Sequence, residues 1–213
     1  MNAPAAAAPA AGGVALASAG ATLLTFVLIV ALHVLKPELA PSSRFVSEYA
    51  IGPYGGIMRV AFVLWALACA TLAVGIRGTL GTRRARVGSA VLLVAAVALV
   101  VAGVFAQDPV TTKPGEGTLA GTLHAAASLV GIPAIPLAAL LLGKPLGASD
   151  DRLLRTTTHL AWMSLLAMMA YLGWAVPRAG GFTPEVHAGA MNRLVVAAYL
   201  GWQLVAALRL RGR

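Results

Sequence analysis

The chain is poor in charge, and this shortage is its most informative property. Asp, Glu, Lys and Arg together make up 11% of the 213 residues, and hydrophobic residues make up 59%. A water-soluble domain carries about 25% charged residues. Because so little charge is available to cover a surface that faces water, the composition excludes an ordinary soluble domain and indicates an integral membrane protein.

Cysteine and catalytic signatures are also scarce. The single cysteine, Cys69, lies within an apolar run and has no second cysteine for an internal disulfide, so we interpret it as a packing residue. The formal net charge is +9, but the basic residues form short clusters between apolar runs without aromatic stacking platforms. This pattern argues against nucleic acid as a partner. The chain has no Walker A motif, dinucleotide-binding glycine fingerprint, GxSxG elbow or HExxH motif.

Six apolar segments are present, and each is long enough to cross about 30 Å of hydrocarbon as a helix. They are predicted at residues 14–35, 55–76, 87–105, 118–142, 156–175 and 188–208. We therefore expect an all-α integral membrane protein with one transmembrane domain over residues 14–208. A disordered Ala/Pro-rich tail is predicted at 1–13 and a basic cytoplasmic tail at 209–213.

The distribution of Lys and Arg predicts the orientation of the six helices. If the N-terminus is inside, the inner side holds ten basic residues and the outer side holds six. The short loop around Arg83 is almost purely basic. Cytoplasmic loops are enriched in Lys and Arg, so both termini are expected in the cytoplasm.

The stretch His33–Met58 is the densest polar run between two spans. A short helix is predicted at 42–51, capped by Ser42 or Ser43 and lying in the membrane interface. Phe45, Val46 and Tyr49 would share one face of it, while Arg44 and Glu48 pair on the other. A well-anchored loop is the alternative reading of this stretch.

Three of the four histidines reach the outer membrane face in this topology: His33, His124 and His187. Three histidines with a carboxylate and an open position for water form a feasible zinc site, and zinc-bound water can attack an ester or amide. The alternative is that each histidine hydrogen-bonds a carboxylate, a carbonyl or water, or serves pH sensing or proton transfer. His159 near the inner face is interpreted as an interfacial or packing residue.

The fourth segment has a face of small and polar residues. Gly117 and Gly121 form a GxxxG pattern, which predicts close approach of another helix, and His124 follows on the same face. Pro133 and Pro136 each remove a backbone donor, so a kink is expected in the middle of the segment. The carbonyl groups that a kink exposes are tolerated only against protein or a wet cavity.

These observations define a candidate polar cluster on the outer face. Its members are His33, Arg44, Ser47, Glu48, Tyr49, Asp108, His124, His187 and Asn192. Within it we expect Arg44 to pair with Glu48, and a histidine to pair with Asp108 or Glu48.

The blocks HVLKPELAPSSRFVSEYAIGPYGGIMR, AQDP at 106–109 and GTLH at 121–124 resemble the family named only as domain of unknown function 998. The resemblance covers roughly residues 20–205 and implies a small prokaryotic multi-span membrane protein with no assigned activity. The ceramidase-like membrane hydrolases, which bind zinc with three His, a Ser and an Asp, are a weaker likeness. Ser47 and Asp108 match those residue types, but the paired histidines of the last helix are missing.

Two functions are therefore expected. The first is a binding or accessory protein without a cofactor, whose polar outer-face site takes a membrane lipid, a small amphiphile or a membrane-protein partner. The alternative is a zinc-dependent intramembrane hydrolase that uses His33, His124 and His187.

Overall fold

The computed structural model describes residues 8–113 and 115–212. It contains six α-helices, each long and apolar enough to cross a membrane, and no strand occurs in the described part of the chain. The prediction of an all-α multi-pass membrane protein is confirmed. The helices are α1 (Ala8–Leu35), α2 (Gly55–Thr79), α3 (Arg83–Val104), α4 (Leu119–Gly143), α5 (Arg152–Ala179) and α6 (Ala188–Arg211).

Two of the predicted boundaries shift. Helix α1 already begins at Ala8, so residues 8–13 of the predicted tail are helical, as their alanine content favours, while residues 1–7 lie outside the described residues. Helix α6 continues to Arg211, so most of the predicted basic tail at 209–213 forms the last turn of a helix. Arginine near a helix C-terminus is favourable because it complements the partial negative charge of the last carbonyl groups.

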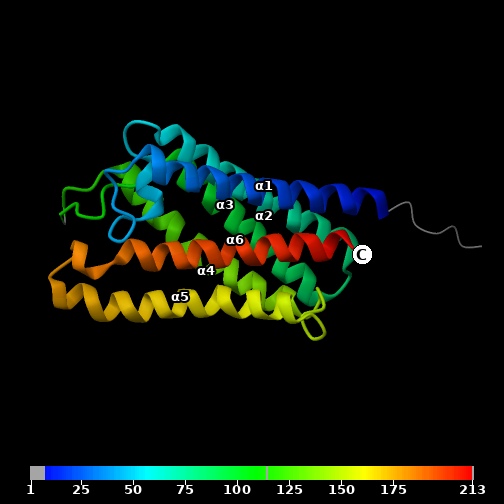
Figure 1. Cartoon of the computed structure of the whole chain (residues 1–213). Coiled ribbons are helices and arrows are strands. Elements are labelled where there is room, and N and C mark those ends of the chain that lie inside the picture. The colour runs from blue at the N-terminus through cyan, green and yellow to red at the C-terminus, as the bar shows by residue number, and fades with distance from the viewer. Residues whose placement is uncertain (1–7, 114, 213) are drawn as a thin grey trace, which may run out of the picture.

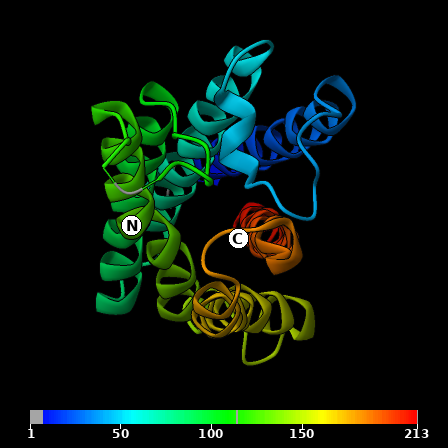
Figure 2. The same cartoon turned by 90° about the vertical axis from the view of Figure 1, so that its left-hand side faces the viewer.

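Helices that are neighbours in the sequence pack against one another, and α1 also packs against α6 (Figure 2). The helices therefore close into a ring in which the first and last spans touch. Helix α5 contacts α4 and α6 and is the least buried of the six spans. Exposed leucine and valine side chains occur on every helix, as a surface in contact with lipid requires.

The loops of the bundle gather at its two ends (Figure 1). We call the loop end the one formed by residues 36–54, 105–118 and 180–187, which include two short 3-10 helices, η1 (Val46–Ala50) and η2 (Pro184–Val186). The basic end is formed by residues 80–82, 144–151 and the C-terminal part of α6. The start of α1 lies at the basic end too, so the first and last helices bring both ends of the described chain to the same side.

Candidate functional site

The segment between α1 and α2 contains a 3-10 helix in place of the predicted short helix at 42–51. Helix η1 begins at Val46, and its N-cap is Phe45 and not Ser42 or Ser43. The carbonyl of Ser42 instead accepts a hydrogen bond of 2.9 Å from the backbone N–H of Ala190 in α6. The capping prediction is wrong because this loop is held by a distant helix, and the placement of η1 in a membrane interface stays a prediction.

Glu48 anchors η1. Its side chain is fully buried and forms an ion pair of 3.0 Å with Arg44, which confirms the predicted pairing. Its two carboxylate oxygens also accept hydrogen bonds from the backbone N–H groups of Phe45, at 2.7 Å, and Val110, at 3.0 Å. Val110 belongs to the loop between α3 and α4, so one carboxylate ties together two loops. A buried charge is tolerated when it is paired and hydrogen-bonded in this way.

Arg193 of α6 is a second anchor, which sequence reasoning missed. Its guanidinium donates to Nε2 of His33 at 2.8 Å, to the carbonyl of Arg44 at 2.6 Å and to the hydroxyl of Tyr49 at 2.9 Å. The same group lies over the Tyr49 ring, 5.5 Å from its centre. The sequence feature that could have revealed Arg193 is its position about one turn inside an apolar span, because an arginine there must find hydrogen-bond acceptors within the protein.

The partner of His33 shows the protonation state of its ring. Nδ1 of His33 lies 2.8 Å from the carbonyl oxygen of Ile29, and a carbonyl only accepts, so this nitrogen carries a proton. Nε2 accepts from Arg193, whose guanidinium only donates. His33 is therefore neutral in this arrangement, and the expected bond from a histidine to Asp108 or Glu48 is not the one that it makes.

Lys36 is the other charged residue that sequence reasoning left out. It is 3% exposed, and its ammonium group donates to the carbonyl oxygens of Tyr49, at 3.4 Å, and Ile51. Tyr49 lies in η1 and Ile51 is its C-cap, so Lys36, which follows α1, satisfies carbonyl groups at the C-terminal end of η1. Two of the three donors of this buried ammonium group are thus used within the protein.

The Asp108 carboxylate bonds to the N-terminal end of α4, whereas the sequence predicted that it would bond to a histidine. Its carboxylate accepts from the backbone N–H of Thr118 at 2.7 Å and from the Thr118 hydroxyl at 2.9 Å. A Cβ atom at Gly121 would collide with this carboxylate. The interpretation of Gly121 as half of a helix-packing motif is therefore wrong, because the glycine leaves room for a capping side chain. Gly131, two turns or more further on, does approach α3, where a Cβ atom would lie 2.9 Å from Ala98.

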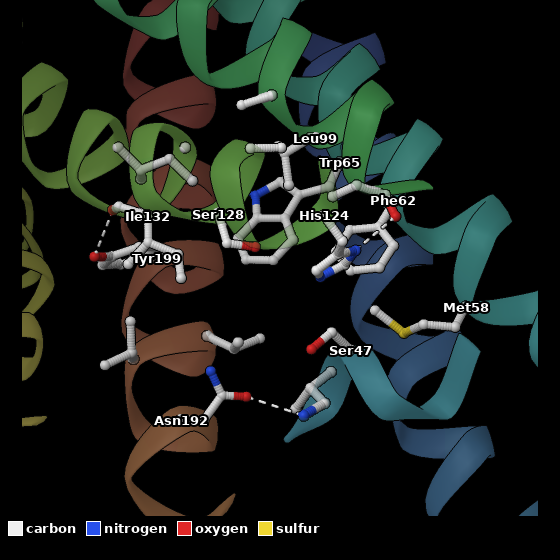
Figure 3. A pocket seen from close by; sticks show the side chains of 18 residues that line it. Ser47, Met58, Phe62, Trp65, Leu99, His124, Ser128, Ile132, Asn192 and Tyr199 are labelled. Carbon is white, nitrogen blue, oxygen red and sulfur yellow. Dashed lines mark hydrogen bonds between the residues drawn. The ribbon is translucent and has the colours of Figure 1, made fainter. Parts of the chain in front are cut away.

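His124 lies at the wall of a cavity, and its ring is 2% exposed. Nδ1 lies 3.1 Å from the carbonyl oxygen of Ala102 and 2.9 Å from that of Phe105, at the end of α3. The ring of Phe62 packs edge-on against it, with centres 5.7 Å apart. As Figure 3 shows, the second ring nitrogen points into the cavity.

The cavity has a volume of about 80 Å³ and lies directly beneath η1. Its walls come from η1, α2, α3, α4 and α6, and they are mostly apolar. The polar side chains that reach it are Ser47, Trp65, His124, Ser128, Asn192 and Tyr199 (Figure 3). The cavity therefore has the general character of a ligand site, which is an apolar pocket with few convergent polar groups.

Several of these polar groups hold the walls in place. Asn192 accepts from the backbone N–H of Val46 at 3.0 Å, and the Ser47 hydroxyl donates to the side chain of Gln107. Trp65 donates to Gln203 at 2.9 Å. These bonds connect η1, the α3–α4 loop, α2 and α6 around one space.

The prolines of α4 are sequence neighbours of Ile132 and Ile135, which line the cavity. Helix α4 runs through Pro133 and Pro136 without interruption. Pro136 has no N–H, so the carbonyl of Ile132 loses its helical partner, and the hydroxyl of Tyr199 donates to it at 2.8 Å. A carbonyl freed by a proline is thus satisfied by a side chain of another helix, as expected for a site inside a membrane.

The three histidines proposed as zinc ligands have separate environments. His33 bonds to Arg193, His124 bonds to the carbonyls of α3, and His187 is exposed at the N-cap of α6. In the described part of the chain no three His, Cys, Asp or Glu side chains are placed to share a metal ion. The donor set required for the zinc-dependent hydrolase is therefore not assembled, and the residues do not fit that metal site.

Comparison with known proteins gives one match. The model of the family described as protein of unknown function (DUF998) matches residues 18–209. The resemblance inferred from the blocks around residues 33–59, 106–109 and 121–124 is confirmed. No curated protein and no solved structure matches the chain.

Proposed function

The chain belongs to the DUF998 family of proteins of unknown function, and we propose that it is a binding protein that holds part of a lipid or small amphiphile in the cavity beneath η1. The protein resides in the prokaryotic cytoplasmic membrane with both termini inside, so the loop end and the cavity beneath it lie toward the extracytoplasmic side. The single observation that carries this proposal is a mostly apolar cavity with polar groups converging on it below the loop end.

The orientation follows from charge. The basic end holds the clusters around Arg83 and Arg152 and the arginines at the end of α6, whereas Glu48 and Asp108 lie at the loop end. Lys and Arg are retained on the cytoplasmic side, so the basic end is inside.

A reporter experiment tests the orientation. A phosphatase that folds only in the periplasm should be inactive when fused after Arg213 and active when inserted at Gly115. The opposite pattern would place the cavity at the cytoplasmic face and overturn this part of the proposal.

The anchors of η1 support the binding role because they determine the shape of the cavity. Val46 and Ser47 form part of the wall, and the neighbouring Glu48 holds both η1 and the α3–α4 loop. A site enclosed by fixed backbone loses little conformational entropy when it takes up a ligand.

A pair of substitutions on α4 tests whether the cavity is occupied. Ser128→Leu fills the cavity, whereas Ala125→Leu adds the same side chain at an exposed position of the same helix. Native mass spectrometry of protein extracted from membranes should detect bound amphiphile on the wild type and on Ala125→Leu, and at least tenfold less on Ser128→Leu. Equal adducts on both variants would contradict binding in this cavity.

A further inference from the structure

The chemistry of the cavity wall specifies the polar end of its ligand. We infer that this end is an uncharged hydroxyl group, which donates a hydrogen bond to Nε2 of His124, and that an aliphatic chain follows it. This inference rests on the proposed function, because it concerns the ligand of the same cavity.

The first step is the tautomer of His124. Both partners of Nδ1 are backbone carbonyl oxygens, at 3.1 and 2.9 Å, so Nδ1 must carry a proton. In the neutral ring Nε2 then has a lone pair and no proton. Within the described residues no hydrogen bond reaches this nitrogen, although the side chain is 98% buried and the nitrogen points into the cavity (Figure 3). The nitrogen itself is open to the space of the cavity, so a donor on whatever fills that space, water or ligand, satisfies it.

The second step is the absence of charge. None of the described residues that line the cavity is Asp, Glu, Lys or Arg. The charged groups nearby in the fold, which are the buried Glu48 and Lys36 and the partly buried Arg193, bond to protein groups. A carboxylate, phosphate or ammonium group in the cavity would lack a counter-charge in a medium of low dielectric, which is costly. The polar end is therefore neutral.

The third step is the need for a group that both donates and accepts. The amide of Asn192 uses its oxygen for Val46, so its nitrogen is the atom left to donate, and the hydroxyl of Ser128 also faces the space (Figure 3). An ether or a ketone can accept from these groups but cannot donate to His124. A hydroxyl does both.

The fourth step is size. A volume of about 80 Å³ is below the 300–1,000 Å³ that pockets for drug-sized ligands have, so it accommodates a hydroxyl and a few carbons. The remaining wall is made of Met58, Phe62, Leu99, Ile135, Val195 and similar side chains, which favour a hydrocarbon chain. An aliphatic alcohol meets all four conditions with the smallest polar group.

Photolabelling with a defined probe tests the inference. The probe is a decanol that carries a diazirine close to its hydroxyl carbon, and the wild-type protein is held in lipid nanodiscs. Saturable labelling is expected on cavity-lining peptides of η1, α4 and α6. At equal membrane concentration, 1-decanol should displace the probe at least tenfold more effectively than decanoate, decylamine or the methyl ether of decanol.

Two histidine substitutions provide the matched control. His124→Asn keeps a donor near the position of Nδ1 for the α3 carbonyls but removes the acceptor, so the affinity for the probe should fall about tenfold. His159→Asn changes a histidine of α5 that bonds Trp162 outside the cavity, and it should leave labelling unchanged.

The outcomes separate the two proposals. Saturable labelling of the cavity that the methyl ether or decanoate displaces as well as decanol would overturn the hydroxyl inference and leave cavity binding intact. The same holds if folded His124→Asn is labelled like the wild type. The ether competition needs no variant, so it decides the matter even if His124→Asn does not fold. Labelling confined to the outer groove of α3 and α4, around Val97 and Leu123, would overturn both.

Discussion

The two ends of the bundle use the same pair of chemical groups in different ways. At the loop end, Arg44 pairs with a Glu48 side chain that is 0% exposed, and the carboxylate also receives two backbone donors. At the basic end, Arg209 pairs with Asp151, and their side chains are 44% and 23% exposed. Exposed ion pairs contribute little to stability, whereas the loss of one partner from a buried pair is strongly destabilising.

The comparison teaches that burial, and not the count of ion pairs, shows where the fold depends on charge. At the loop end the charged groups hold backbone segments in place over a cavity. At the basic end the ion pair of Arg209 and Asp151 is partly exposed, and in the proposed orientation the basic clusters there keep this end in the cytoplasm.

The largest effect is expected from Glu48→Gln. The substitution removes the charge opposite Arg44 and places an amide donor against backbone N–H groups, so the free energy of unfolding should fall by about 3 kcal/mol. Denaturant unfolding in mixed micelles measures it. Glu185→Gln, an exposed carboxyl at the same end, is the control and should have no measurable effect. Equal effects of the two would remove the distinction between buried and exposed charge.

A smaller loss is expected from Arg193→Lys, which keeps the charge but not the fork of donors. The lysine can reach only some of His33, Tyr49 and the Arg44 carbonyl, so the free energy of unfolding should fall by about 2 kcal/mol. Arg178→Lys is the matched control, because Arg178 is exposed and bonds only within its own helix. If both variants unfold alike, the Arg193 contacts do not hold the loop end together.

Tyr199→Phe sharpens the comparison in the middle of the bundle, where no charge is involved. The Ile132 carbonyl next to Pro136 would lose its donor, and the variant should be less stable by about 1 kcal/mol. The double variant Tyr199→Phe, Pro136→Ala restores an N–H for that carbonyl and should recover part of the loss. No recovery would show that the hydroxyl acts elsewhere.

The smallest effect is expected at the basic end. The hydrogen bond from Arg209 holds the pKa of the Asp151 carboxyl below its usual value. A depressed pKa adds stability above the pKa of the unfolded chain, and this contribution is lost as the pH falls through the folded value. Because the Asp151 side chain is only partly buried, this contribution is small, so Asp151→Asn should lower the unfolding midpoint at pH 7 only slightly and flatten its decline in acid. A clear loss at pH 7 would make the two ends equivalent.

The helices could be predicted because hydropathy acts over each segment by itself. All six spans appear within a few residues of their predicted ends, apart from the earlier start of α1. The pair of Arg44 and Glu48 was predictable because the two residues are only four positions apart in the sequence.

The rest of the site depends on contacts between distant segments, which one sequence does not contain. His33 meets Arg193 across 160 positions, and Val46 meets Asn192 across 146. Gly121 looked like half of a helix-packing motif, and only the position of Asp108 shows what occupies the space beside it. The sequence singled out His124 but not its partners, which are backbone carbonyl groups that every residue possesses.

The closure of the ring by α1 and α6 has a consequence for the assembly of the protein during synthesis. The chain emerges from the ribosome N-terminus first, so the segment around Arg44 and Tyr49 has emerged before Arg193 is synthesised. Until α6 arrives, the Arg44 carbonyl and the Tyr49 hydroxyl lack their final donor, and the Ser42 carbonyl lacks the N–H of Ala190. Helix α6 therefore completes the loop that follows α1, and the cavity beneath η1 takes its final shape only after α6 has been made.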